Sequence, residues 1–158
     1  HITSIGSHVF NNCKNLKKID FSPNSELRYI NEYAFCNLQI ESILIPKHVK
    51  RIGSNAFREC NQLKSVVFQP DSELIEIGIS SFRESAIESI TIPSHVKIIN
   101  CYAFNKCKQL KKVEFAQNSE LVSINGYAFI ESSISEINIP PNAKIAKTAF
   151  KNCLNFNT

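Results

Sequence analysis

Cysteine and histidine are the side chains in this sequence that could support a disulfide, a metal site or a nucleophile. The chain of 158 residues contains six cysteines and four histidines. Thiolates and imidazoles bind zinc where several of them converge, and two thiols can join only where their Cα atoms lie within about 7 Å. Four of the cysteines, Cys13, Cys60, Cys107 and Cys153, are spaced 47, 47 and 46 residues apart. This regular spacing means that their geometry depends on a repeating fold.

Motifs that carry catalysis are absent from the sequence. It has no His-Glu-x-x-His pattern, no Gly-x-Ser-x-Gly elbow and no glycine-rich phosphate loop, and its four glycines are isolated. Hydrophobic residues make up 43% and charged residues 20%, which excludes a disordered tail and a strongly basic nucleic-acid binder. No apolar run reaches the roughly 18 residues of a membrane span. We therefore predict one globular domain without catalytic residues, cofactor, metal or membrane insertion.

The elements that must position these side chains come from an internal repeat. Seven segments contain an isoleucine followed five residues later by a phenylalanine, and successive phenylalanines are separated by 25, 22, 25, 22, 25 and 21 residues. The repeat unit is therefore a pair of coils, about 47 residues long, in which two coil types alternate. Such a period is typical of a solenoid, where each coil buries its apolar face against its neighbours. The seven phenylalanines are Phe10, Phe35, Phe57, Phe82, Phe104, Phe129 and Phe150.

A second pattern lies between the phenylalanines. Six segments carry apolar residues at their first, fourth and sixth positions, which predicts strands at 16–21, 40–45, 63–68, 87–92, 110–115 and 134–139. Stacked coil on coil, these strands form one parallel sheet. Pro46, Pro93 and Pro140 follow alternate strands and mark their ends, because proline has no N–H for the ladder. Gly or Asn follows each isoleucine of the first pattern except at Ala146, which predicts a left-handed backbone or a cap on a short helical turn.

In this solenoid the four repeated cysteines occupy one position in every second coil. Alternate coils lie about 9–10 Å apart, so these thiols cannot pair or share a metal and are predicted to be small core residues. Cys36 and Cys101 lie outside this position, and a disulfide from Cys36 to a neighbouring coil or between Cys101 and Cys107 stays open. His48 and His95 follow equivalent prolines two coils apart, which predicts surface turns.

The net charge of +4 does not gather in one place. Lys17, Glu41, Lys64, Glu88 and Lys111 occupy the second strand position of successive coils and alternate in sign. Neighbouring strands lie about 5 Å apart, so this column predicts cross-strand pairing that specifies the register of the coils. The charge distribution therefore does not predict binding to nucleic acid.

The outward positions of the strands form the surface best suited to a partner. This surface consists of small polar side chains around an apolar centre at Leu44 and Val67, which we expect to be the only exposed apolar side chains. It has no aromatic cluster on which bases or sugars could stack. The predicted protein-binding residues are Ser42, Leu44, Ser65, Val67, Ser89 and Thr91.

The string Ala-Phe-x-x-Cys-x-x-Leu around Phe57 recurs around Phe104, and around Phe150 with Phe156 in the place of leucine. Together with the Leu-x-x-Leu-x-Leu spacing of the strands, it resembles the BspA-like subfamily of leucine-rich repeats over essentially the whole chain. The resemblance implies an α/β-type solenoid, a right-handed arc of about seven coils with a strand-lined concave face and an irregular or short-helical convex side. It also implies a surface protein of mucosal bacteria or protozoan parasites that binds host matrix or cells.

We therefore predict one leucine-rich repeat domain over residues 1–158, truncated at both ends from a longer array. It would act as a non-catalytic adhesion module and surface antigen, with a host matrix or cell-surface protein as partner. The alternative is a cytoplasmic scaffold for protein interactions, which free cysteines and the lack of an Asn-x-Ser/Thr site favour. End-to-end packing between copies is predicted from the apolar residues at the two ends, Ile2, Ile5, Phe10, Phe150, Leu154 and Phe156.

Overall fold

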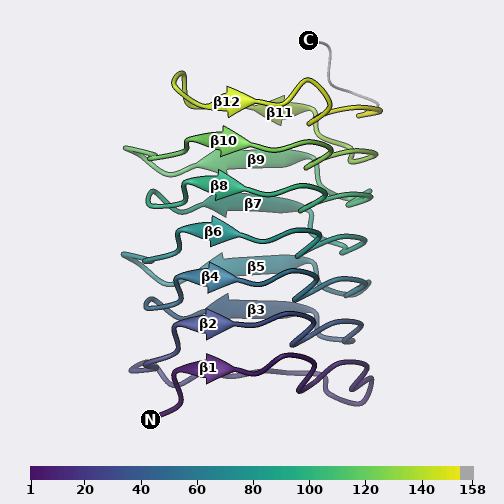
Figure 1. Cartoon of the computed structure of the whole chain (residues 1–158). Coiled ribbons are helices and arrows are strands. Elements are labelled where there is room, and N and C mark those ends of the chain that lie inside the picture. The colour runs from purple at the N-terminus through teal and green to yellow at the C-terminus, as the bar shows by residue number, and fades with distance from the viewer. Residues whose placement is uncertain (154–158) are drawn as a thin grey trace.

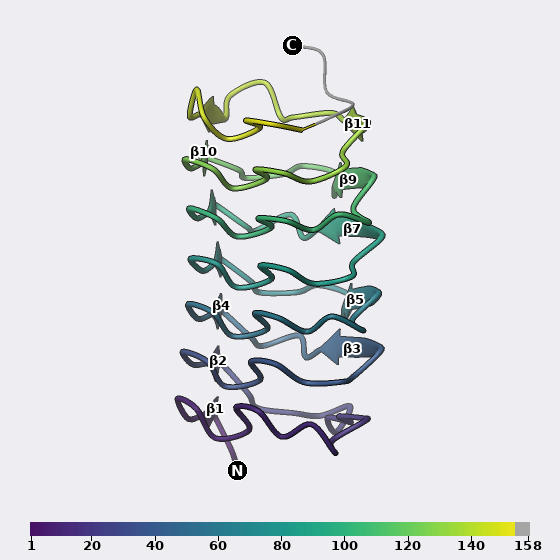
Figure 2. The same cartoon turned by 90° about the vertical axis from the view of Figure 1, so that its right-hand side faces the viewer.

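The computed structural model describes residues 1–153, which form a parallel β-solenoid of about six turns (Figures 1 and 2). Leu154 and Phe156 lie outside the described residues. Seven isoleucine–phenylalanine segments enclose six turns, which corrects the predicted seven coils. The strands are β1 (Ser4–Ile5), β2 (Tyr29–Ile30), β3 (Ser42–Ile45), β4 (Arg51–Ile52), β5 (Ser65–Phe68), β6 (Glu76–Ile77), β7 (Ser89–Ile92), β8 (Ile98–Ile99), β9 (Lys112–Phe115), β10 (Ser123–Ile124), β11 (Glu136–Ile137) and β12 (Lys144–Ile145).

One side of the solenoid is a continuous sheet that the sequence pattern did not predict. Its order is β1-β2-β4-β6-β8-β10-β12, and every pair in it is parallel. Each of these strands is two residues long and ends in an isoleucine of the repeat, so that Ile30 pairs with Ile52 and Ile52 with Ile77. We call this side the short-strand face. A strand of two residues is too short to show an alternation of apolar and polar residues in the sequence, so the sequence pattern shows only its isoleucine.

The opposite side carries the predicted strands, and we call it the long-strand face. Five of the six predicted segments contain a strand, while residues 16–21 contain none. The predicted single sheet is also wrong, because β3 pairs only with β5, and β7, β9 and β11 form a separate sheet. The long-strand face is therefore interrupted between β5 and β7.

The proline column explains where this interruption falls. In the pairs β3–β5 and β7–β9, the residue that follows the second strand donates one more hydrogen bond to the end of the first strand. Gln69 N donates to Ile45 O at 3.0 Å, and Ala116 N donates to Ile92 O at 2.9 Å. The equivalent residue above β5 is Pro93, which has no N–H to donate to the Phe68 carbonyl. Alternate interfaces of the long-strand face therefore lose their closing hydrogen bond.

The other two proline interfaces follow the same rule. Pro46 stands above residues 16–21, which form no strand, and Pro140 stands above β9, where pairing with β11 stops after two residues. The two interfaces without proline, β3–β5 and β7–β9, each pair over four residues. Proline at these positions thus ends the strand and also weakens the contact with the coil below.

The third side is built from turns, and no helix occurs among residues 1–153, which corrects the predicted short-helical convex side. Residues two before and two after a phenylalanine, such as Asn55 and Glu59, have φ of 57° and 60°, which a right-handed helix cannot contain. Their N–H groups reach the next coil, where Asn55 donates to Ile79 O and Glu59 to Arg83 O, each at 2.8 Å. These bonds satisfy the turn amides between coils.

The glycine or asparagine after each repeat isoleucine neither adopts a left-handed backbone nor caps a helical turn, so both predicted roles are wrong. No glycine has a positive φ, and the left-handed residues stand two positions further along. Glycine is needed for close approach, because a Cβ at Gly78 would lie 2.5 Å from Ile52 O. Two of the asparagines link coils, with Asn100 Nδ2 donating to Glu76 Oε1 at 2.8 Å and Asn125 Nδ2 to Asn100 Oδ1 at 3.1 Å.

The core contains the predicted column of phenylalanines. Phe35, Phe57, Phe82, Phe104 and Phe129 are at most 1% exposed, and successive rings, including Phe10 and Phe150 at the ends, stack with centroids 5.1–5.6 Å apart. Each ring of this column therefore stacks on the rings of the adjacent coils, as expected for a solenoid.

Candidate functional site

The structure brings four of the six predicted binding residues together on the long-strand face. Register pairs join Ser42 with Ser65 and Leu44 with Val67, because β3 and β5 are continuous. The side chains of Leu44 and Val67 point outward, with 48% and 51% of each residue exposed. They form an apolar pair beside two hydroxyl groups.

Ser89 and Thr91 stand on β7, across the interruption from β5. The six residues therefore lie on one side of the molecule but on two separate sheets. No side-chain hydrogen bond between described residues involves Ser42, Ser65 or Ser89. Three hydroxyl groups on this face are thus available to a partner.

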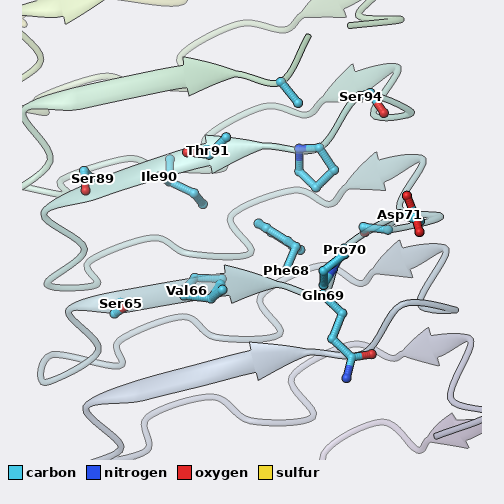
Figure 3. A pocket seen from close by; sticks show the side chains of 14 residues that line it. Ser65, Val66, Phe68, Gln69, Pro70, Asp71, Ser89, Ile90, Thr91 and Ser94 are labelled. Carbon is cyan, nitrogen blue, oxygen red and sulfur yellow. The ribbon is translucent and has the colours of Figure 1, made fainter. Parts of the chain in front are cut away.

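An open cavity of about 450 Å³ follows the interruption between β5 and β7 (Figure 3). Its lining includes Ser65, Val67, Ser89 and Thr91 of the predicted set. The Phe68 side chain lies between the C-terminal ends of the two strands (Figure 3), and it is only partly buried. The cavity was not predicted, although the proline that produces it is visible in the sequence.

Charged residues on this face pair with each other within one coil, two positions apart in the sequence. Lys18 Nζ lies 2.8 Å from Asp20 Oδ2, and Lys112 Nζ lies 2.7 Å from Glu114 Oε1. The hydrogen bond between Lys112 and Glu114 raises the pKa of the lysine and lowers the pKa of the glutamate. Both pairs are exposed and therefore contribute little to stability.

The predicted pairing of the alternating Lys/Glu column is not observed. Among residues 1–153, the ion pairs within 4.0 Å do not include Lys17, Glu41, Lys64, Glu88 or Lys111. All five side chains are exposed, so water competes with any partner in the next coil. The column therefore does not specify the register of the coils through ion pairs.

The expectation that Leu44 and Val67 are the only exposed apolar side chains is wrong. Ile75 and Val122, which directly precede β6 and β10 on the short-strand face, are 42% and 51% exposed, and Ile79 in the turn after β6 is 48% exposed. Because that sheet was not predicted, the outward position of these residues could not be assigned. They provide an apolar surface with which the long-strand face can be compared directly.

The repeated cysteines belong to the core where the solenoid covers them. Cys60 and Cys107 are fully buried, and their thiols lie 3.2 and 3.1 Å from the carbonyl oxygens of Phe35 and Phe82 in the coil below. Burial raises the pKa of Cys60 to about 12 and that of Cys107 to about 11. All six cysteines are free, and Cys13 is exposed. The buried thiols are therefore poor nucleophiles.

His48 and His95 form a repeated contact between coils. His48 Nδ1 lies 2.8 Å from Glu73 Oε1, and His95 Nδ1 lies 2.8 Å from Glu120 Oε1. The hydrogen bond from His48 lowers the pKa of Glu73. Within the described part of the chain, no three His, Cys, Asp or Glu side chains could hold a metal ion, and no helix could cross a membrane.

The chain matches known repeat proteins over most of its length. A family model described as a BspA type leucine rich repeat region matches in six copies, over residues 1–76 and 28–157. No curated protein sequence matches the chain.

Solved structures with the same fold come from several bacteria. A leucine-rich repeat protein from Bacteroides ovatus is 29% identical with a TM-score of 0.85, and the match covers 98% of this chain and 39% of that one. A leucine-rich cell surface protein from Faecalibacterium prausnitzii is 27% identical with a TM-score of 0.58, covering 84% and 42%. The pneumococcal vaccine antigen PcpA is 23% identical with a TM-score of 0.62, covering 90% and 50%. The chain spans half or less of each of these proteins.

Proposed function

This chain belongs to the family of BspA-type leucine-rich repeat proteins, and we propose that it is a non-catalytic, protein-binding segment of a cell-surface protein that attaches to host matrix or cells. The similar protein from F. prausnitzii is described as a cell surface protein, which supports this location. Protein interaction is a common role of such repeats, because stacked coils present an extended and rigid surface.

The observation that carries this proposal is the composition of the long-strand face. Leu44 and Val67 are neighbours on adjacent strands and about half exposed, and they lie beside unpartnered hydroxyls. An apolar pair on a flat, rigid sheet with polar surroundings has the character of a protein interface, where apolar side chains lie at the centre and polar groups at the rim. The proposed contact residues are therefore Ser42, Leu44, Ser65, Val67, Ser89 and Thr91.

A binding experiment with a matched control tests this assignment. Immobilised fibronectin, laminin and collagen would be probed by interferometry with the parent chain and with the Leu44→Glu, Val67→Glu double variant. The control is the Ile75→Glu, Val122→Glu variant, which places the same charges on equally exposed positions of the short-strand face. We expect binding to one of these proteins, at least about tenfold weaker in the first variant and unchanged in the control.

Two results would contradict the proposal. Undiminished binding by the Leu44→Glu, Val67→Glu variant would move the site to the turns or to the short-strand face. Absence of binding to all three proteins and to epithelial cells would remove the adhesion role.

We also propose that residues 1–158 are one segment of a longer array. The chain covers 39% of the B. ovatus protein while nearly all of the chain is matched, which supports this view. At the N-terminal end, Ile5, Phe10, Leu16 and Phe21 line an open cavity of about 700 Å³. Light scattering over a concentration series should therefore show end-to-end association of this segment, and a strictly monomeric segment would contradict it.

A further inference from the structure

The interruption of the long-strand face leaves a hydrogen-bond acceptor without its usual donor. In both four-residue pairs the N–H after the upper strand closes the ladder, but Pro93 occupies that position above Phe68. The Phe68 carbonyl therefore faces the gap between β5 and β7 without a ladder donor. A buried or half-buried carbonyl in this situation favours any N–H that can enter the gap.

The shape of the cavity suits a side chain together with the backbone beside it. About 450 Å³ of open space lies over β5, β7 and the turns that follow them, and Phe68 and Pro93 contribute apolar surface to its lining. The cavity opens to solvent along the sheet, so a segment of a partner can lie across the strands and direct one side chain inward.

Charge decides which side chain fits. Asp71 is the only charged residue in the lining, and its carboxylate already lies 3.9 Å from Lys47 Nζ. An acidic group would therefore enter a site that has no basic residue in its lining, at a cost in desolvation. A basic side chain would gain little from Asp71, because that carboxylate is strongly exposed to water and already lies near Lys47. An uncharged apolar side chain incurs neither cost.

Resting on the protein-binding role proposed above, we propose that the β5–β7 gap is the specificity pocket of this face. It receives an uncharged apolar side chain, of the size of leucine, from an extended peptide segment of the protein partner. The backbone N–H of that segment donates to the Phe68 carbonyl from the open side of the cavity. Ser65 and Ser89 stand at the end of the cavity where the two coils still meet, with Glu88 N donating to Lys64 O at 3.2 Å, and supply hydroxyl contacts to the peptide backbone.

Blocked tripeptides test the pocket without knowledge of the natural partner. Ac-Gly-Leu-Gly-NH₂, Ac-Gly-Lys-Gly-NH₂ and Ac-Gly-Glu-Gly-NH₂ would be titrated into the ¹⁵N-labelled chain and followed by amide chemical shifts. We expect the leucine peptide to shift the amides of β5 and β7 with a saturable dependence on concentration. The lysine and glutamate peptides should leave them unchanged. No saturable shift with the leucine peptide, or equal shifts with all three, would overturn the proposal.

The Pro93→Ala variant supplies the missing donor and should close the gap. Its new amide at position 93 should exchange slowly with solvent, and its affinity for the leucine peptide should fall by at least about fivefold, the equivalent of one hydrogen bond. Pro46→Ala is the matched control, because it makes the same change at an interface outside this cavity. Unchanged affinity in a Pro93→Ala protein whose new amide is protected would overturn the role of the Phe68 carbonyl.

The two proposals fail separately. If the leucine peptide does not bind while Leu44→Glu with Val67→Glu still abolishes matrix binding, the face binds proteins without this pocket. If the peptide binds as described while no matrix protein or cell is recognised, the pocket stands and the adhesion role is wrong.

Discussion

Phe82 provides the most direct test of packing between neighbouring coils. Its ring is fully buried between Phe57 and Phe104, with centroid separations of 5.3 and 5.4 Å. Truncation to alanine leaves a cavity and removes both ring contacts. Phe→Ala in a protein core costs about 3–5 kcal/mol, and each aromatic pair contributes about 0.5–1.5 kcal/mol. With two pairs broken, we expect the free energy of unfolding of Phe82→Ala to fall by about 4–5 kcal/mol.

The control for this variant is Phe10→Ala, which makes the same chemical change at the end of the column. Phe10 is only partly buried and stacks on one ring, that of Phe35, at 5.6 Å. Because one ring contact is lost and water can reach the site, we expect a loss of about 1–2 kcal/mol.

Urea denaturation followed by circular dichroism measures both changes, and thermal melting gives an independent value. For a domain of this size, 1 kcal/mol corresponds to about 2–4 °C, so Phe82→Ala should melt about 8–20 °C below the parent. A melting temperature within a degree or two of the parent would refute the packing argument. Equal losses in Phe82→Ala and Phe10→Ala would refute its dependence on neighbouring coils.

Three further changes test individual groups. Ser81 has a buried hydroxyl without a hydrogen-bond partner, at a position where the neighbouring coils have alanine. Ser81→Ala should therefore raise the free energy of unfolding, measured by urea denaturation, by about 1 kcal/mol, and a decrease would show that the hydroxyl has a partner. Because burial raises the pKa of Cys60 to about 12, iodoacetamide at pH 8 should label exposed Cys13 and spare Cys60 in peptide mass maps, and equal labelling would contradict its burial. NMR titration should place the pKa of Glu73 below its ordinary value of 4.5, and His48→Ala should raise this pKa, because the contact with His48 stabilises the ionised carboxylate. The contribution of this contact to stability is present above the unfolded-state pKa of Glu73 and is lost as the pH falls through the lowered pKa of the folded state.

The sequence was sufficient to predict the stack of coils and its phenylalanine column. Burial in a solenoid requires the same residue type at the same place in every coil, so Phe35, Phe57 and Phe82 appear as a period in the sequence. The alternating positions of Ser42, Ile43, Leu44 and Ile45 equally predict a strand with one buried side.

Other features depend on contacts that no single coil contains. Two-residue strands such as Arg51–Ile52 have no alternation of their own, and their pairing comes from the neighbouring coils. The effect of Pro93 on β5 is of this kind, because the proline acts on the carbonyl of Phe68 in the coil below as well as on its own strand. The predicted binding residues were therefore assigned to one surface, and the gap that divides Ser65 from Ser89 was missed.

The alternation of interfaces has a mechanical consequence for the adhesion role proposed above. Interfaces that contain proline carry fewer hydrogen bonds on the long-strand face than the four-residue pairs between them. Under tension along the solenoid axis, coils should therefore peel away two at a time, at the prolines spaced 47 residues apart. Each step releases about 170 Å of chain, at ~3.6 Å per extended residue. Such steps lengthen the attachment while the remaining pairs of coils stay folded.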